Sequence, residues 1–181
     1  MYKIIAFLVL SIPVIYLSRK SIVHIRSHGF YRFLAWECIV WLAVSNIQYW
    51  FVKPFSPAQI ISWICLLYSI YPLVEGVKAI KKMGKSDETR DTSLHGFEKT
   101  GDLIETGIFR YIRHPMYSSL LFLTWGIFFK HITLLLFIIA LLSTVFLLVT
   151  ALSEEKENMA YFGDRYGEYM KRTKRFVPFI I

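Results

Sequence analysis

The chain has 181 residues and a net charge of +8, and 55% of its residues are hydrophobic while only 19% are charged. Soluble domains average about 45–50% apolar and about 25% charged residues, so this composition excludes a disordered chain and argues against an ordinary soluble domain. The two cysteines, Cys38 and Cys65, lie in apolar runs and exclude a disulfide-rich secreted scaffold.

Five apolar segments are candidates for membrane-spanning helices, because a helix that rises about 1.5 Å per residue needs about 20 residues to cross the hydrocarbon core. In chain order they are Met1–Leu17, Phe33–Val52, Pro57–Val77, Met116–Phe129 and Ile132–Leu152. The first resembles a signal peptide, but it lacks a small-residue cleavage site, so we expect it to be retained. The fourth would reach only about 21 Å. It must sit in a thinned bilayer, be lined by protein, or form a hairpin with the fifth.

Basic residues are concentrated on one side of these segments. All but three of the 21 lysines and arginines lie in residues 18–32, in residues 78–114 or in the tail after the fifth segment. The exceptions are Lys3, Lys53 and Lys130. Because basic residues are retained on the cytosolic side, the pattern predicts five spans, with the N-terminus outside and the C-terminus in the cytosol. The membrane topology accounts for the positive charge, so we expect no nucleic-acid partner.

The predicted fold class is therefore all-α, a polytopic membrane protein with about five transmembrane helices. We expect one integral membrane domain over residues 1–181. Its predicted parts are three N-terminal spans over 1–77, a cytosolic loop over 78–114, a helical hairpin over 115–152 and a cytosolic segment over 153–181.

The last of these segments contains apolar residues at spacings of three and four. They are Met159, Phe162, Tyr166 and Tyr169 or Met170. This spacing predicts an amphipathic helix that breaks near Gly163, with Asp164 as its cap. Such a helix either lies on anionic lipid or covers a site beside the fourth span, and aromatic residues such as Phe176 would anchor its end at the interface.

Ionisable residues near membrane depth gather on the predicted cytosolic side. They are Glu37, about one turn inside the second span, together with Glu75, Arg113, His114, Glu154 and Glu155. Ionisable groups within membranes often mark function, although residues at the interface can simply be solvated. The functional interpretation is favoured for the last four.

Pro115 predicts the start of the fourth helix, with His114 as its cap and Arg113 just outside. Free backbone N–H groups and a guanidinium at a helix N-terminus make an anion site. Tyr117 lies one helical step further. Such a pocket suits a cosubstrate with a carboxylate and an aromatic base, or a lipid headgroup.

Several common cofactor motifs are missing from the sequence. No two of the nine glycines form a Gly-X-Gly triplet, and there is no Walker A, HExxH or GxSxG motif. The five histidines do not have the spacing of a zinc site. We therefore expect no metal.

The motifs in order resemble the isoprenylcysteine carboxyl methyltransferase family and the related phospholipid N-methyltransferases. The resemblance rests on GIFRYIRHPMY at residues 107–117, the Glu154-Glu155 pair, FGDRYGEY at residues 162–169, and Pro178. It covers Thr106–Phe179. It implies a helical membrane enzyme that uses S-adenosyl-L-methionine as its cofactor and acts on a lipophilic or lipidated substrate.

The resemblance also implies a set of site residues. Catalytic roles fall to Arg113, Glu154 and Glu155. Contacts with the cofactor fall to Gly107, Phe109, Arg113, His114, Pro115, Tyr117, Glu155 and Tyr166. The chain departs from the family at two positions, with Phe109 where the family often has tyrosine and Ser119 where it often has glycine.

The expected reaction is methyl transfer to a carboxylate, an amine or a thiol at the cytosolic face of a bacterial or archaeal inner membrane. A carboxylate needs no base, whereas an amine or a thiol needs Glu154, Glu155 or His114 as the base. One alternative is an NAD(P)H-dependent membrane reductase of the steroid-reductase type, which usually has Phe-Gly-Glu where this chain has Ser118-Ser119-Leu120. A non-catalytic membrane protein is another. Besides the substrate, the expected partners are membrane lipids, and the oligomeric state stays open.

Overall fold

The computed structural model describes residues 2–23, 27–83 and 101–178. Over these ranges the chain is all-α, as predicted. The α-helices are α1 (Tyr2–Ile22), α2 (His28–Asn46), α3 (Pro57–Met83), α4 (Pro115–Phe128), α5 (Leu134–Phe162) and α6 (Asp164–Arg172). Two short 3-10 helices, η1 (Ile47–Tyr49) and η2 (Gly107–Arg110), lie between them.

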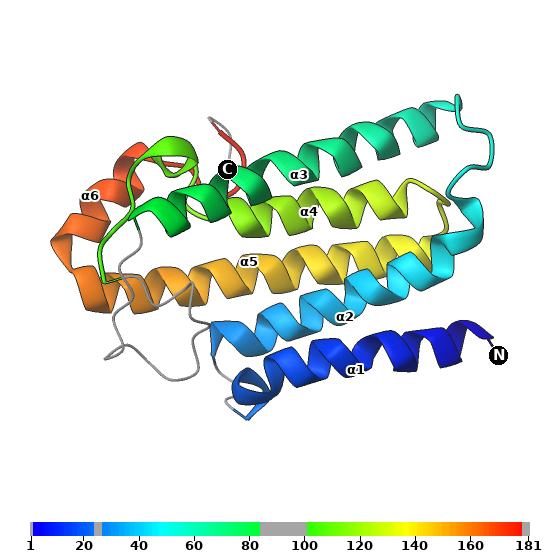
Figure 1. Ribbon diagram of the computed structural model, residues 1–181, viewed down its shortest axis with the longest axis horizontal. Coiled ribbons are helices and arrows are strands. Elements are labelled where there is room, and N and C mark those ends of the chain that lie inside the picture. Colours follow the sequence, from blue (N-terminus) through cyan, green and yellow to red (C-terminus); the bar gives the residue numbers. More distant parts are fainter. Residues whose placement is uncertain (1, 24–26, 84–100, 179–181) are drawn as a thin grey trace.

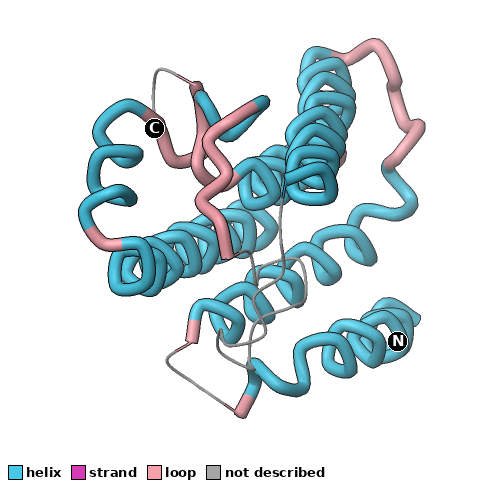
Figure 2. The backbone as a smooth tube through the Cα atoms, turned by 60° about the vertical axis from the view of Figure 1, so that its left-hand side comes forward, coloured by secondary structure: helices cyan, strands magenta, loops and turns pink. Residues whose placement is uncertain are grey.

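Helices α1 to α5 lie side by side along a common direction (Figure 1). Helix α1 packs on α2, and α2 packs on both α5 and α4. Helix α4 in turn packs on α5 and on α3. Helix α6 lies beyond the end of α5, next to the segment that leads into α4 (Figures 1 and 2). We call this end of the bundle the α6 end. It brings together the start of α2, the end of α3, the start of α4 and the end of α5.

Three helices of the described chain, α1, α3 and α5, are long and apolar enough to cross a membrane, and α4 is a shorter apolar helix. Large apolar side chains such as Leu8, Ile64 and Leu142 are exposed on the outside of the bundle, as expected where lipid replaces water. The chain is thus a multi-pass membrane protein. Spans by α2 and α4 and the orientation of the bundle stay predictions.

Helix α2 begins five residues earlier than the apolar pattern suggested, at His28 instead of Phe33. Ser27 caps it by accepting a hydrogen bond from the backbone N–H of Phe30. The position of Glu37 about one turn inside the second membrane span stays a prediction. Glu37 lies in the middle of α2, where its carboxylate accepts a hydrogen bond of 2.6 Å from Ser11 of α1.

Helix α5 continues past Leu152, the expected end of the fifth span, as far as Phe162. The residues in between include alanine, methionine, glutamate and lysine, which favour helix. The predicted break at Gly163 is confirmed, and its φ of +59° favours glycine. Asp164 is the first residue of α6 rather than its cap.

The C-terminal tail runs parallel to the chain that leads into α4. The backbone N–H groups of Arg113 and His114 donate to the carbonyls of Lys174 and Arg175, at 2.8 and 3.1 Å. Phe176 is buried in the core instead of anchoring the tail at an interface as expected. These contacts place the tail against the start of α4.

The predicted cytosolic loop of residues 78–114 is helical at its beginning, because α3 continues to Met83. The described residues resume at 101, and η2 then leads to α4. The sequence suggests a mobile or ligand-ordered loop between residues 78 and 106, and residues 84–100 of it lie outside the described residues.

Candidate functional site

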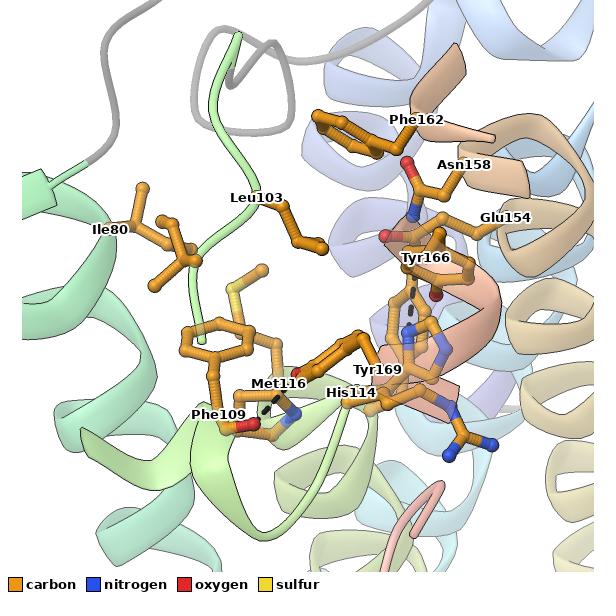
Figure 3. Close-up of a pocket in the computed structure, with 14 residues that line it drawn as sticks. Ile80, Leu103, Phe109, His114, Met116, Glu154, Asn158, Phe162, Tyr166 and Tyr169 are labelled. Carbon is orange, nitrogen blue, oxygen red and sulfur yellow. Dashed lines mark hydrogen bonds and ion pairs between the residues drawn. The ribbon is translucent and has the colours of Figure 1, made fainter. Parts of the chain in front are cut away.

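A cleft opens at the α6 end between α3, η2, α4, α5 and α6 (Figure 3). It contains about 650 Å³ of empty space, part of which is open to solvent. It is lined by Ile80, Leu103, Ile104, Phe109, Arg113, His114, Pro115, Met116, Tyr117, Glu154, Asn158, Phe162, Tyr166 and Tyr169.

The cleft has two walls of different character. Ile80 and Leu103 lie on one side of the cavity, whereas Glu154, Asn158 and Tyr166 lie on the other (Figure 3). The first wall is apolar, and the second combines polar groups with an aromatic ring. A ligand with one apolar part and one polar part would match this division.

Helix α5 supplies much of the polar wall. Glu154, Asn158 and Phe162 follow one another at intervals of four residues, so they share one face of the helix. All three line the cleft. Adjacent helical residues differ in direction by about 100°, and Glu155 accordingly is not among the lining residues.

Glu155 instead holds two arginines. Its side chain is 5% exposed, and its carboxylate accepts hydrogen bonds from Arg113 Nε at 2.9 Å and from Arg175 Nη2 at 2.8 Å. The bond to Glu155 raises the pKa of the Arg175 guanidinium. This carboxylate therefore ties the start of α4 and the tail to α5.

Arg113 has further partners within the chain. Its Nη1 donates to the carbonyls of Met170 and Thr173, and its side chain is 7% exposed. Because the backbone N–H groups of Arg113 and His114 already bond to the tail, the donors expected to bind an anion here bind the protein's own carbonyl and carboxylate groups.

His114 lies between the two neighbouring carboxylates. It caps α4, with Pro115 as the first helical residue, as predicted. Its Nδ1 is 3.7 Å from Glu154 Oε2 and its Nε2 is 3.4 Å from Glu155 Oε1. The imidazole also stacks on the Tyr117 ring, with 5.4 Å between the ring centroids. The imidazole thus lies close to both the lining carboxylate and the buried one.

Two tyrosines of α6 close the cleft. Tyr166 and Tyr169 are each 2% exposed, and burial raises the pKa of both phenols. They stay protonated at neutral pH and can donate hydrogen bonds. Tyr169 donates to the carbonyl of Phe109 at 2.7 Å, which fastens α6 to η2 (Figure 3).

Most of the residues predicted for the site lie together in this cleft. Those that line it are Phe109, Arg113, His114, Pro115, Tyr117, Glu154 and Tyr166. Gly107 and Glu155 do not line it. Gly107 begins η2 with a φ of +61°, a conformation that favours glycine. Gly107 therefore contributes by allowing the backbone to turn at the start of η2.

The sequence interpretation did not assign site roles to several residues that line the cleft. They are Ile80, Leu103, Ile104, Met116, Asn158, Phe162 and Tyr169. Asn158 and Phe162 could have been found by their helical spacing from Glu154. Ile80 carries no such signal, because only the packing of α3 on α4 brings it to the cleft.

Comparisons with known proteins extend over much of the chain. A family model described as phospholipid methyltransferase matches residues 58–169. Methanethiol S-methyltransferase of Pseudomonas deceptionensis is 31% identical over 71 residues, which cover 39% of this chain and 26% of that protein. The enzyme of the same name from Crocosphaera subtropica is 31% identical over 72 residues, covering 40% of this chain and 28% of that protein. The matches thus span little more than a quarter of these relatives. No solved structure matches the chain.

Proposed function

Because the chain belongs to the phospholipid methyltransferase family, we propose that it binds S-adenosylmethionine in the cleft and transfers a methyl group to a lipophilic acceptor. The observation that carries this proposal is the position of the Glu154 carboxylate, which lines the cleft among aromatic side chains. When bound, S-adenosylmethionine supplies a methyl group on a positively charged sulfonium.

The lining residues suit the parts of this cofactor. The Glu154 carboxylate complements its positive charges, and the rings of Phe162 and Tyr166 can pack against its aromatic base or its cation. The Asn158 amide offers both donors and an acceptor for its polar groups. We therefore assign the wall formed by α5 and α6 to the cofactor.

The apolar wall suits the acceptor. Ile80, Leu103 and Met116 present no charged group there, so a lipophilic substituent can pack against them and leave its nucleophile facing the cofactor. Positioning of the two reactants and exclusion of water would then supply most of the rate acceleration.

Among carboxylate, amine and thiol acceptors, the relatives favour a thiol, because both are methanethiol S-methyltransferases by name. A thiol must lose its proton to become the nucleophile. His114 and Glu154, whose Nδ1 and Oε2 atoms are 3.7 Å apart, are the groups at the cleft that can accept it. An isoprenylcysteine-type carboxylate would need no base.

The first test is calorimetric binding of S-adenosylhomocysteine to the detergent-purified protein, with NADPH in parallel. We expect binding of the former alone. Glu154→Gln should weaken it at least about tenfold, whereas Glu168→Gln, at a side chain 71% exposed on α6, should not change it. Binding of NADPH alone would support a reductase. Binding of neither by folded protein would contradict methyl transfer.

The acceptor can then be identified with methyl-labelled S-adenosylmethionine and three lipophilic compounds: an alkanethiol, a farnesylated cysteine and phosphatidylethanolamine. A labelled thioether would support the thiol. A labelled methyl ester or N-methylated lipid would replace the thiol with the corresponding acceptor.

A further inference from the structure

Two buried basic side chains lie at the start of α2, outside the residues that the family model matches. His28 is 2% exposed and Arg32 is 3% exposed. They are four residues apart and so lie on one face of the helix. Helix α2 packs against both α4 and α5, the helices that carry Tyr117 and Glu154.

The first of the two, His28, contacts α5 through its imidazole. Its Nδ1 is 2.8 Å from Glu157 Oε2, three residues beyond Glu154. The contact fastens the first turn of α2 to α5, next to the carboxylate that lines the cleft. Arg32 lies one helical turn further along α2, on the same face as His28.

Arg32 interacts with the Tyr117 hydroxyl group and with Glu154. Tyr117, which is 4% exposed, also forms a side-chain hydrogen bond with Glu154. His114 Nδ1 is 3.7 Å from Glu154 Oε2. The Glu154 carboxylate is thus held between α2 and the start of α4.

This arrangement limits where the Glu154 side chain can point. Glutamate has several rotatable bonds, and a carboxylate at a protein interior is costly unless it is paired. Arginine keeps its charge and presents several donors in a fixed plane. A guanidinium that interacts with both Tyr117 and Glu154 therefore favours one orientation of the carboxylate.

We infer that Arg32 is a positioning residue of the cleft, which acts through Tyr117 to hold the Glu154 carboxylate toward the bound methyl donor. This inference rests on the proposed function. It extends the functional unit to α2, a helix that supplies no lining residue among the described ones.

The test is a double-mutant cycle on the affinity for S-adenosylhomocysteine, measured by calorimetry with the full-length protein. Arg32→Gln should weaken binding about tenfold, the size expected for coupling between contacting residues. In a Glu154→Gln background, the same change should have an effect within about twofold. Arg19→Gln, at an exposed position on α1, is the matched control and should leave binding unchanged.

An equal weakening by Arg32→Gln in both backgrounds would overturn the inference, because Arg32 would then act on the fold alone. If Arg32→Gln does not fold, Tyr117→Phe removes a single hydroxyl group from the same connection, and its cycle with Glu154→Gln gives the same comparison. Failure of the wild-type protein to bind S-adenosylhomocysteine would overturn the proposed function and this inference together. Binding by the wild type with an additive cycle would overturn the inference alone.

Discussion

At the scale of single residues, the two adjacent glutamates of α5 have different roles because their side chains point in different directions. Glu154 lines the cleft, and Glu155 is 5% exposed between Arg113 and Arg175. The first is placed to meet a ligand, and the second connects segments of the chain. Their replacement by glutamine should therefore have different consequences.

Glu155→Gln should lower the free energy of unfolding by about 3–5 kcal/mol, because it leaves two arginines without their carboxylate partner. Glu154→Gln should change stability less and ligand affinity more, because its side chain is 25% exposed at the cleft. Thermal unfolding in detergent and calorimetric binding would measure the two effects. Equal small effects of both variants would indicate that these are ordinary surface charges.

Arg113 also makes contacts that a lysine cannot reproduce. Lysine keeps the charge but cannot bond through separate nitrogens to Glu155 and to the Met170 and Thr173 carbonyls. Arg113→Lys should lower the free energy of unfolding by about 1.5–3 kcal/mol and reduce methyl transfer.

Thermal unfolding and turnover with labelled methyl donor would measure both effects of Arg113→Lys. Arg110→Lys, at an exposed residue of η2, is the control. If Arg113→Lys behaved like that control, the bonds of Arg113 would be dispensable.

At the scale of elements, glycines allow α3 and α4 to approach closely. A Cβ atom on Gly126 would lie 2.9 Å from side-chain atoms of Leu66 and 3.1 Å from its backbone nitrogen. Nearer the cleft, a Cβ on Gly76 would lie 3.1 Å from Pro115. The position of the cleft thus depends on two helices that pack with little space between them.

Gly126→Ala should force α4 away from α3 and lower the free energy of unfolding by about 1–3 kcal/mol. Gly167→Ala in α6 is the control, since its Cβ would lie 3.6 Å from the flexible Met159 side chain. The control should be neutral or stabilising by up to about 1 kcal/mol. Thermal unfolding of both variants would show the difference, and equal melting temperatures would contradict the close packing.

At the scale of the whole molecule, α6 and the last turns of α3 and α5 lie at one end of the bundle (Figure 1), and residues of these elements line the cleft. The loop between η1 and α3 lies at the other end. The distribution of lysine and arginine predicts that the α6 end faces the cytosol, where S-adenosylmethionine is available to the cleft.

Labelling of single cysteines would test this orientation. In a background with Cys38→Ser and Cys65→Ser, Phe55→Cys places a thiol at a position 89% exposed, and Glu168→Cys places one on α6. A membrane-impermeant maleimide should label the first in intact cells and the second only after permeabilisation. The reverse pattern would invert the predicted topology.

The sequence by itself determined the all-α fold, the approximate helices and half of the residues that line the cleft. Long apolar runs, Pro115 at a helix start and Gly163 at a helix break act locally, so their signals can be read along the chain. The same local signals did not locate the start of α2 at His28, because polar residues continue that helix beyond its apolar part.

Only the tertiary structure decided which glutamate lines the cleft, and that Arg113 holds the tail. It also placed Ile80 of α3 in the lining of the cleft and Arg32 of α2 near Glu154. These relationships join residues far apart in the chain, and helix periodicity fixes only the angle between neighbours on one helix. Packing against the other helices determines which face of each helix points into the cleft. No local sequence pattern specifies this packing.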